Sequence, residues 1–353
     1  MASEFQIEKQ VRNNIRQLVP YSSARDDFSG SASVFMDANE NPHNPPLNRY
    51  PDPKQQELKK KIVSLKDQQP ENLFLGNGSD EGIDLLIRVM CDPGKDQVIT
   101  VDPTYGMYGV CASINDVSRK SVLLREDFSL DAGAVLSAVN DRTKLIFLCS
   151  PNNPTSNSLD RHAMLEIIDG APCLVVVDEA YVDFSTGPGL LSLVPEKRNL
   201  VVLQTLSKAW GLAGIRLGMV FAQPDLIRYL SAVKYPYNVN ALSMEEAMDR
   251  LNSPETMSAL VERILAGRAR LSQKLGSYSF VERVYSSDAN FLLVKMQQPE
   301  KVYSHLMERG IIVRDRSSVP LCEGCLRITV GTDKENSLLV DALSDYAYKK
   351  DNL

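Results

Sequence analysis

Short apolar runs alternate with amphipathic segments from residue 73 to residue 222. The runs are rich in Val, Ile and Leu and lack polar residues at every second position, which is typical of parallel strands that helices cover on both faces. Strands are predicted at 73–76, 97–102, 120–124, 144–150, 173–181, 199–207 and 218–222, with helices between the earlier ones at 80–90, 104–114, 131–139 and 160–169. This alternation predicts an α/β fold with a doubly wound, mainly parallel sheet.

The flanking segments have different patterns. Residues 1–30 are predicted to form an N-terminal arm with one short helix, and residues 31–240 the large domain, which includes a helix near 54–67. After Asn240 the pattern changes to a long helical stretch followed by few strands. A helix is expected at 241–275, strands at 290–296, 311–315 and 326–331, and helices at 299–309 and 335–349. These elements predict a smaller α+β domain at 241–353, joined by the arm.

Charge and hydropathy exclude several classes of partner. The 353 residues include 45 acidic and 39 basic side chains, for a net charge of -6. Such a surface repels a phosphate-rich polymer, so no nucleic acid is expected as a partner. No apolar run reaches the roughly 18 residues that a membrane span needs, so no membrane partner is expected. The first residues lack the apolar segment of a signal peptide, and a cytoplasmic location is predicted.

Cysteine and histidine usage gives no sign of a metal centre. Cys149 and Cys173 fall inside apolar runs and are expected to be small buried hydrophobic residues. Cys322 and Cys325 form a CxxC, but a zinc or redox site needs a second pair, a pair of histidines or a thioredoxin-like context. The three histidines are scattered along the chain. No metal is therefore expected.

The segment TLSKAWGLAGIRLG, residues 205–218, places Lys208 where a strand ends. Most lysines are simply solvated on the surface, but this one is predicted to sit on a tight strand-to-helix turn before a helix of small residues. Ser207 precedes it and Arg216 follows it by eight residues. Hydroxyls and a guanidinium suit a phosphate, while an amine suits a Schiff base with an aldehyde. Pyridoxal phosphate carries both groups, so Lys208 is the predicted nucleophile.

A carboxylate ends the apolar run in LVVVDEAYVDF, residues 174–184. Ligands of open α/β sheets bind at the carboxyl ends of the strands, where Asp178 is expected to lie. Asp178 is suited to pair with a pyridinium nitrogen, and Tyr181 to reach a ring hydroxyl. The alternatives are a helix cap, a metal ligand or a nucleotide site, and the chain has no GxxxxGK[ST] motif for a nucleotide.

Three further segments carry weaker signals. In CSPNNPTSN, Asn152 or Asn153 is placed to donate to a ring oxygen, although Asn-Pro also favours ordinary turns. In LFLGNGSDEGIDLL, Ser79 and Asp80 begin a helix whose free N–H groups suit a phosphate, although helix capping explains the same residues. In PTYGMY, Tyr105 follows a strand and is suited to stack on a ring, although such aromatics are more often core.

Taken in order along the chain, eight motifs resemble the histidinol-phosphate aminotransferase family. They are ANEN, NRYPDP, GNGSDEGID, PTYGMY, SPNNPT, VVDEAY, TLSKAWGLAGIRLG and GCLRITVGT. The resemblance extends from about residue 19 to residue 332. It implies the fold-type I architecture of pyridoxal 5'-phosphate enzymes within the wider class I and II aminotransferases. It also implies a homodimer.

The resemblance assigns a role to each matching residue. In the cofactor site, Lys208 is implied to form the Schiff base and Asp178 to bind the ring nitrogen. Tyr181 and Asn153 are implied to bind the ring oxygen, and Tyr105 to stack on the ring. The residues implied to bind the phosphate are Ser79, Asp80 (through its backbone), Ser207 and Arg216. Tyr50 is implied to reach the cofactor phosphate of the other subunit. The family usually has glycine where this chain has Ser156, which leaves the conformation of that turn open.

Substrate contacts follow from the same resemblance. Arg327, in LRITVG, is the implied substrate arginine, because its planar fork suits both the phosphate of histidinol phosphate and the carboxylate of glutamate. Arg314, Tyr21 and Asn39 are expected to line the rest of the substrate space. The alternative for Arg327 is an exposed arginine at a strand edge.

The implied reaction is a transamination in two half-reactions. Glutamate gives its amino group to the cofactor and leaves as 2-oxoglutarate, and the cofactor then aminates imidazole acetol phosphate to histidinol phosphate. An aromatic aminotransferase and a threonine-phosphate decarboxylase keep the same cofactor motifs and remain alternatives. A non-catalytic regulator that binds pyridoxal phosphate would need a DNA-binding module, for which the arm is too short and the chain too acidic.

Overall fold

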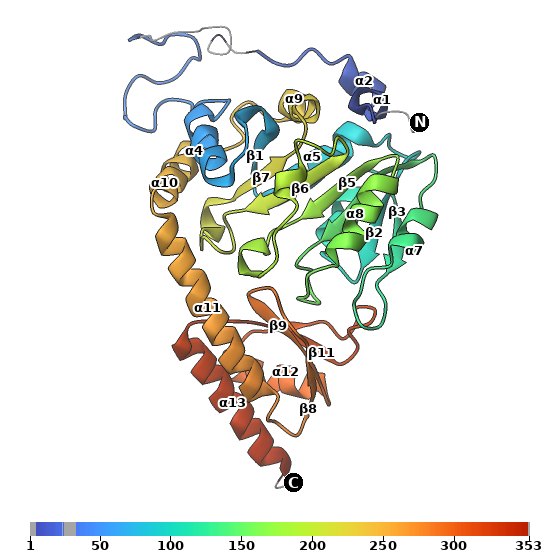
Figure 1. Ribbon diagram of the computed structural model, residues 1–353. Coiled ribbons are helices and arrows are strands. Elements are labelled where there is room, and N and C mark those ends of the chain that lie inside the picture. The colour runs from blue at the N-terminus through green and yellow to red at the C-terminus, as the bar shows by residue number, and fades with distance from the viewer. Residues whose placement is uncertain (1–4, 23, 25–32, 352–353) are drawn as a thin grey trace.

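A computed structural model describes residues 5–22, 24 and 33–351, and its strands form two sheets (Figure 1). The larger sheet has seven strands in the order β1-β7-β6-β5-β4-β2-β3. Strand β7 runs antiparallel to both neighbours, and the strands from β6 to β3 are parallel. The predicted mainly parallel α/β sheet is confirmed. Its strands are β1 Leu73–Asn77, β2 Gln97–Asp102, β3 Ser118–Leu123, β4 Thr143–Cys149, β5 Leu174–Asp178, β6 Leu200–Thr205 and β7 Leu217–Phe221.

Both faces of the larger sheet are buried, which explains why its strands show no polar alternation. In β5, Val175 and Val177 belong to one buried cluster, and Leu174 and Val176 belong to another. The first cluster contains side chains of α4 Gln56–Lys66, α7 Ala132–Ser137, α8 Arg161–Gly170 and α10 Ala241–Leu251. The second contains side chains of α5 Ser79–Met90, α6 Met107–Ile114 and α9 Pro224–Val233. Helix α9 was not among the predicted elements.

The carboxyl ends of three central strands meet at one edge of the sheet. Cys149 at the end of β4 pairs with Asp178 at the end of β5, and Asp178 pairs with Leu203 of β6. After β6 the chain passes through Lys208 and returns as β7, so that Thr205 pairs with Gly218. The predicted helix of small residues after Lys208 is wrong. The connection between β6 and β7 consists of turns and a single 3-10 turn, η4 Ala213–Ile215, because left-handed backbone at Gly211, with a φ of 68°, and at Arg216, with a φ of 56°, interrupts a helix.

The smaller sheet has four antiparallel strands in the order β10-β11-β9-β8. These strands are β8 Val281–Val284, β9 Phe291–Met296, β10 Arg314–Asp315 and β11 Cys325–Thr329. Leu326 and Ile328 pack against α11 Pro254–Leu275, α12 Pro299–Glu308 and α13 Asp333–Asp351. Figure 1 shows α11 running from the larger sheet to the smaller one, beside α13. Strand β8 was not predicted, because its sequence VERV is half charged.

One long helix at 241–275 was expected, but the structure has two. Helix α10 ends at Leu251, and α11 begins at Pro254. Proline has no N–H to donate within a helix and favours the first helical position, so a new helix begins there. The boundary predicted at residue 240 remains a prediction. Asn240 caps α10, since its side chain accepts from the N–H of Ser243 at 2.9 Å.

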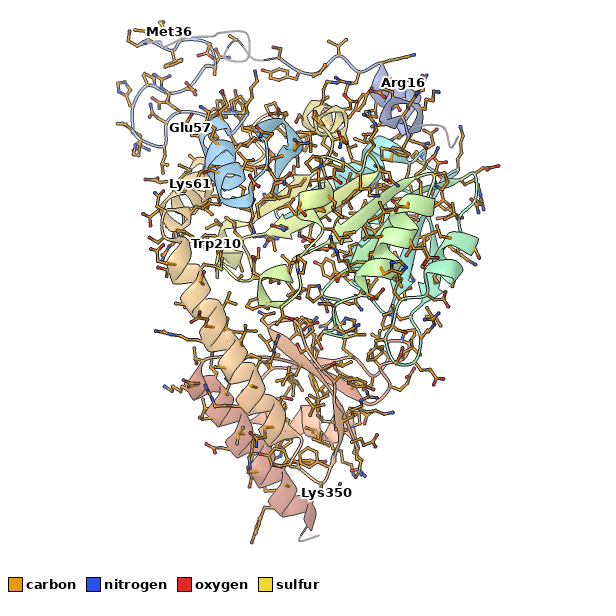
Figure 2. All side chains as sticks on the ribbon, viewed as in Figure 1. Arg16, Met36, Glu57, Lys61, Trp210 and Lys350 are labelled. Atoms are coloured by element: carbon orange, nitrogen blue, oxygen red, sulfur yellow. The ribbon has the colours of Figure 1, made fainter. Side chains whose placement is uncertain are left out.

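The arm was expected to join the smaller domain, and for its described residues this is wrong. The described part of the arm includes two short helices, α1 Ile7–Gln10 and α2 Asn13–Arg16, which contact α9 of the larger domain. Ile7 is fully buried there, and Arg12 pairs with Asp92 at 3.2 Å. The boundary predicted between residues 30 and 31 lies outside the described residues. Trp210, labelled in Figure 2, belongs to the same buried cluster as Ala247 and Leu251 of α10.

Candidate active site

One cavity opens at the carboxyl ends of β4, β5 and β6. It contains every residue that was expected to bind the cofactor except Tyr50. Its lining consists of Ser79, Asp80, Tyr105, Cys149, Asn153, Asp178, Ala180, Tyr181, Thr205, Ser207, Lys208, Ala213 and Arg216. The sheet topology explains the gathering, because parallel strands bring their carboxyl ends and the following loops to one edge.

Lys208 is half-buried in this cavity, and its Nζ lies 5.5 Å from the ring centre of Tyr181. Burial lowers the pKa of the Lys208 amine below its ordinary value, and the positive charge of Arg327 lowers it further. The charge of Arg216 acts in the same direction, while the carboxylate of Asp178 acts against it. The net shift favours the neutral amine, which is the nucleophilic form.

Asp178 is buried, with 3 % of its surface exposed, and both carboxylate oxygens accept hydrogen bonds. The hydroxyl of Tyr108 donates to Oδ2 at 2.7 Å, and the N–H of Ala180 donates to Oδ1 at 3.1 Å. Burial raises the pKa of Asp178, and these hydrogen bonds oppose the rise. A buried carboxylate of this kind is stabilised by a cation placed against it, and a protonated pyridine nitrogen meets that need.

Tyr108 was missed from the sequence. It is fully buried, and its ring stacks on Phe147 with ring centres 4.8 Å apart. The available signal was its spacing, because it follows Tyr105 by three residues in the segment predicted to be helical, although α6 begins only at Met107. The sequence could not show that its hydroxyl meets Asp178, which lies 70 positions further along the chain.

The amino end of α5 forms an anion-binding cradle. Gly78 caps the helix without a side-chain hydrogen bond, so first-turn N–H groups stay available to a ligand. Gly78 has a φ of 79°, and a Cβ there would lie 2.6 Å from Nη2 of Arg216. A Cβ on Gly218 would lie 2.1 Å from the backbone nitrogen of Ser79. Both glycines are needed for this close approach of backbone and guanidinium.

Asp80 uses its side chain to hold two other residues of the cavity. Its Oδ1 accepts from the hydroxyl of Tyr105 at 3.0 Å, and its Oδ2 lies 3.7 Å from Nη2 of Arg216. The backbone N–H of Asp80 lies in the first turn of α5, and its binding of an anion remains a prediction. Across the cradle, the hydroxyl of Thr205 lies 3.0 Å from that of Ser207.

Of the two candidate asparagines, only Asn153 lines the cavity. Its Nδ2 donates to the hydroxyl of Tyr181 at 3.4 Å, and its Oδ1 accepts from Nη1 of Arg327. Asn152 instead donates to the carbonyl of Pro103 at 2.8 Å and holds the turn. Asn153 therefore links the arginine of the smaller sheet to the tyrosine beside Lys208.

Ser156 takes the backbone conformation that glycine adopts easily, with a φ of 68°. It is fully buried, and its hydroxyl donates to the carbonyl of Ser286 at 3.1 Å. Its backbone N–H donates to the carbonyl of Asn152 at 2.8 Å. The turn is thus formed with serine, and the serine hydroxyl adds a contact to the loop between β8 and β9 of the smaller sheet.

Five predicted residues are not part of the cavity lining, and one of them, Arg327, reaches it through its hydrogen bond to Asn153. Tyr21 is exposed and lines a separate pocket, and Asn39 and Tyr50 line another. The ring of Tyr50 stacks on Tyr237, with centres 4.4 Å apart. Arg314 is exposed, and in the antiparallel pairing of β10 with β11 it lies opposite Arg327. Within one copy of the chain, Tyr21, Asn39 and Tyr50 are therefore not brought to Lys208.

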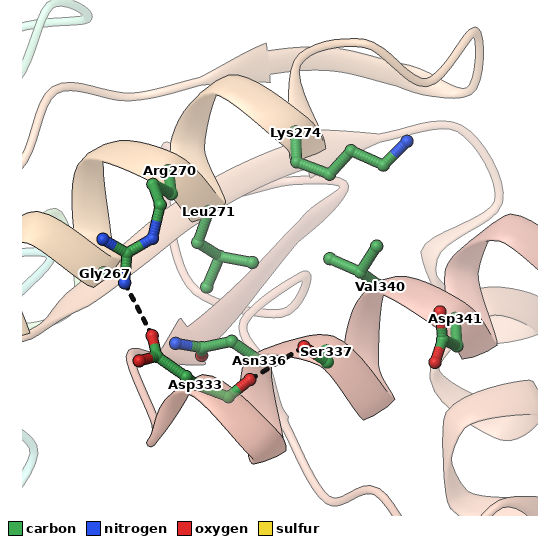
Figure 3. A pocket seen from close by; sticks show the side chains of 9 residues that line it. All are labelled: Gly267, Arg270, Leu271, Lys274, Asp333, Asn336, Ser337, Val340 and Asp341. Carbon is green, nitrogen blue, oxygen red and sulfur yellow. Dashed lines mark hydrogen bonds and ion pairs between the residues drawn. The ribbon is translucent and has the colours of Figure 1, made fainter.

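A further groove lies between α11 and α13 and contains none of the predicted site residues (Figure 3). Arg270 and Asp333 form an ion pair of 2.6 Å across it. Cys322 and Cys325 are buried free thiols. Within the described residues, no group of three or more His, Cys, Asp or Glu side chains is placed to hold a metal, and no helix is long and apolar enough to cross a membrane.

The cavity suits pyridoxal phosphate group by group. The amine of Lys208 suits the aldehyde, the buried Asp178 suits the ring nitrogen, and the cradle with Arg216 suits the phosphate. Tyr181 and Asn153 lie together where a ring oxygen needs donors. The donor set of this cavity therefore fits that cofactor.

Comparison with known proteins places the chain in a family. The sequence profile of the family "Aminotransferase class I and II" matches residues 26–343. The histidinol-phosphate aminotransferase of Parabacteroides distasonis is 54% identical over 335 residues, which cover 95% of this chain and 97% of that protein. The histidinol-phosphate aminotransferase of Cytophaga hutchinsonii is 46% identical over 346 residues, which cover 97% of this chain and 99% of that protein.

Solved structures show the same fold. The histidinol-phosphate aminotransferase of Clostridium acetobutylicum superimposes with a TM-score of 0.80 at 23% identity, covering 86% of this chain and 92% of that one. The histidinol-phosphate aminotransferase of Sinorhizobium meliloti, solved in complex with pyridoxal-5'-phosphate, superimposes with a TM-score of 0.78 at 23% identity. The superposition covers 85% of this chain and 83% of that one. The fold is therefore fold-type I. On its sequence and its fold, this chain belongs to the class I and II aminotransferases and, within them, to the histidinol-phosphate aminotransferase family.

Proposed function

We propose that this chain is a pyridoxal-phosphate-dependent aminotransferase of histidine biosynthesis. It interconverts L-histidinol phosphate and 2-oxoglutarate with imidazole acetol phosphate and L-glutamate. The observation that carries the proposal is the meeting of Lys208, Asp178 and Arg216 in one cavity with the amino end of α5. The identity of 54% to a histidinol-phosphate aminotransferase over nearly the whole chain supports the choice of substrate.

Pyridoxal phosphate, when bound, supplies an aldehyde that condenses with amines and a ring that accepts electrons. Lys208 would hold that aldehyde through its Nζ. Its Nζ would then take the proton from the α-carbon of the substrate and deliver it to the former aldehyde carbon, a role that its lowered pKa favours. Asp178 would keep a proton on the pyridine nitrogen, and Arg216 and Ser207 would hold the phosphate.

Arg327 is proposed to bind the anion of both donors. Histidinol phosphate carries CH₂–O–phosphate where an amino acid carries its carboxylate, so one guanidinium serves both groups if it makes a paired contact. Burial lowers the pKa of Arg327 below its ordinary value, as expected for a charge held out of water. Its hydrogen bond to Asn153 ties substrate binding to the ring-oxygen contacts.

A second copy of the chain is proposed to complete the site. Tyr50 and Asn39 share a pocket outside the Lys208 cavity, and Tyr50 is half exposed. A contact between Tyr50 and a cofactor phosphate therefore requires the cavity of another copy, and a homodimer provides it. Tyr21 is proposed to reach the substrate in the same assembly. Leu47 and Leu242 of the same pocket are exposed apolar side chains.

The function is tested by an amino-donor screen on the purified, cofactor-loaded protein. Single-turnover absorbance is recorded with L-histidinol phosphate, L-glutamate, L-phenylalanine and L-threonine O-3-phosphate. Rapid conversion with the first two and slow conversion with phenylalanine is the expected result. Faster conversion with phenylalanine would instead identify an aromatic aminotransferase. Release of CO₂ from threonine phosphate would identify a decarboxylase.

A further inference from the structure

Three arginines share one face of the smaller sheet. Arg314 of β10 pairs with Arg327 of β11. The pairing of the two strands continues beyond Asp315, where the N–H of Arg316 donates a hydrogen bond of 2.9 Å to the carbonyl of Cys325. Because every second residue of a strand points to the same side, the side chains of Arg314, Arg316 and Arg327 lie on one face.

That face is turned toward the larger sheet and its cavity. Cys325 shares the face with Arg327, and Leu293 of β9 lies directly opposite Arg327. Both Cys325 and Leu293 are buried in the cluster that contains the larger sheet. Leu326 and Ile328, which point the other way, pack in the cluster with α11, α12 and α13. The three arginines therefore project toward the large domain.

One donor of the Arg316 guanidinium lacks a hydrogen-bond partner. Its Nε is buried and makes no hydrogen bond. Within the described part of the chain, none of the three arginines forms an ion pair with a carboxylate. Burial lowers the pKa of Arg316, and the positive charges of Arg327 and Arg314 lower it further. A buried guanidinium donor without a partner is costly, so the arrangement favours an anionic ligand.

We propose that Arg316 is a specificity-determining residue that binds the phosphate of the substrate together with Arg314 and Arg327. The inference rests on the proposed function and adds a residue to it. A carboxylate carries one charge and is satisfied by the paired contact of a single arginine. A phosphomonoester carries nearly two charges and three terminal oxygens at neutral pH, so it uses further donors. Arg316 therefore favours phosphorylated substrates over amino acids.

The test compares Arg316→Gln with wild type and with Arg283→Gln as a matched control. Arg283 is an exposed arginine on β8, at the opposite edge of the same sheet. The rate constants of single turnovers give kcat/KM for L-histidinol phosphate, for L-histidinol without the phosphate, and for L-glutamate. Calorimetric titration of the cofactor-loaded protein with inorganic phosphate gives a binding constant that does not depend on turnover.

Arg316→Gln is expected to lower kcat/KM for histidinol phosphate at least about tenfold and to weaken inorganic phosphate binding by a similar factor. In Arg316→Gln, kcat/KM for glutamate and for histidinol should change less than about threefold. Arg283→Gln should match wild type in kcat/KM for all three donors and in phosphate binding. Equal losses for all three donors, or unchanged phosphate binding, would overturn the assignment. If wild type itself fails to convert histidinol phosphate, the proposed function fails, while the phosphate titration still decides the role of Arg316.

Discussion

The hydroxyl of Tyr108 donates a hydrogen bond of 2.7 Å to the carboxylate of Asp178, and both side chains are buried. The bond joins the first turn of α6 to the end of β5. It stabilises the ionised form of a carboxyl group whose pKa is raised by burial. Tyr108 thereby acts on the cavity through Asp178, although it does not line the cavity itself.

Replacing Tyr108 by Phe removes this donor and keeps the ring. The pKa of Asp178 should rise further, because burial then acts with one opposing hydrogen bond fewer. The ionised form then appears only at higher pH, so the acidic limb of the kcat profile should move to higher pH. The rate at neutral pH should fall about tenfold, or about 1.4 kcal/mol.

The pH dependence of kcat and of the bound-cofactor absorbance checks this prediction. Tyr229→Phe, on α9, is the control and should leave both profiles unchanged. An unshifted acidic limb in Tyr108→Phe would mean that Asp178 is held ionised by other groups.

Asp178→Asn should separate activity from stability. Because the pKa of Asp178 is raised in the folded chain, the neutral carboxyl favours folding. The neutral carboxyl contributes fully to the free energy of unfolding at pH values below the ordinary pKa of an aspartate. This contribution is lost as the pH rises through the raised pKa of the folded chain. The cofactor-free variant should therefore be more stable than wild type at neutral pH, by about 1 kcal/mol. Turnover should collapse, since no charge holds the pyridine proton.

Urea unfolding of the cofactor-free proteins at pH 4 and pH 7 measures the effect. The advantage of the variant should be larger at pH 7 than at pH 4. A near-normal rate in Asp178→Asn would place the partner of the ring nitrogen elsewhere.

Lys208→Ala should reduce steady-state turnover by about a thousandfold or more, because it removes the proposed nucleophile and proton carrier together. Lys60→Ala, an exposed lysine of α4, is the control. Borohydride treatment followed by mass spectrometry should label Lys208 in wild type and leave the Lys208→Ala variant unlabelled. Turnover within about tenfold of wild type would show that another lysine carries the cofactor.

Arg327→Lys should weaken both half-reactions, because an ammonium group cannot make the paired contact with carboxylate or phosphate. The expected loss in kcat/KM is about 2–4 kcal/mol for each donor. Single-turnover absorbance with glutamate and with histidinol phosphate measures the two losses separately. A variant that keeps its rate with glutamate while losing histidinol phosphate would require two separate anion sites.

Mixing inactive Tyr50→Phe with inactive Lys208→Ala should restore activity if two copies share each site. A hybrid dimer then contains one cavity with an intact Lys208 and an intact Tyr50 from the other copy. Up to about a quarter of the wild-type rate is expected from random exchange of subunits. If exchange is verified by mass spectrometry and no activity returns, Tyr50 does not act across an interface.

The sequence determined the large sheet and most of the cavity, because both depend on local patterns. Apolar runs of strand length mark β5 and β6, and the polar residues that end them mark Asp178 and Lys208. Since parallel strands share an edge for their carboxyl ends, the meeting of these side chains follows from the pattern alone. The short strand β8 could not be predicted in this way, because half of its residues are charged and it contains no apolar run.

Only the tertiary structure decided which distant side chains meet. Tyr108 and Asp178 are 70 positions apart, and Arg327 and Asn153 are 174 apart. Their pairing depends on the packing of α6 against the sheet and of the smaller sheet against the larger one. The turn after Lys208 and the common face of Arg314, Arg316 and Arg327 depend on strand pairing. Local periodicity specifies which side of an element is buried, but contacts between elements far apart in the sequence fix register and partners.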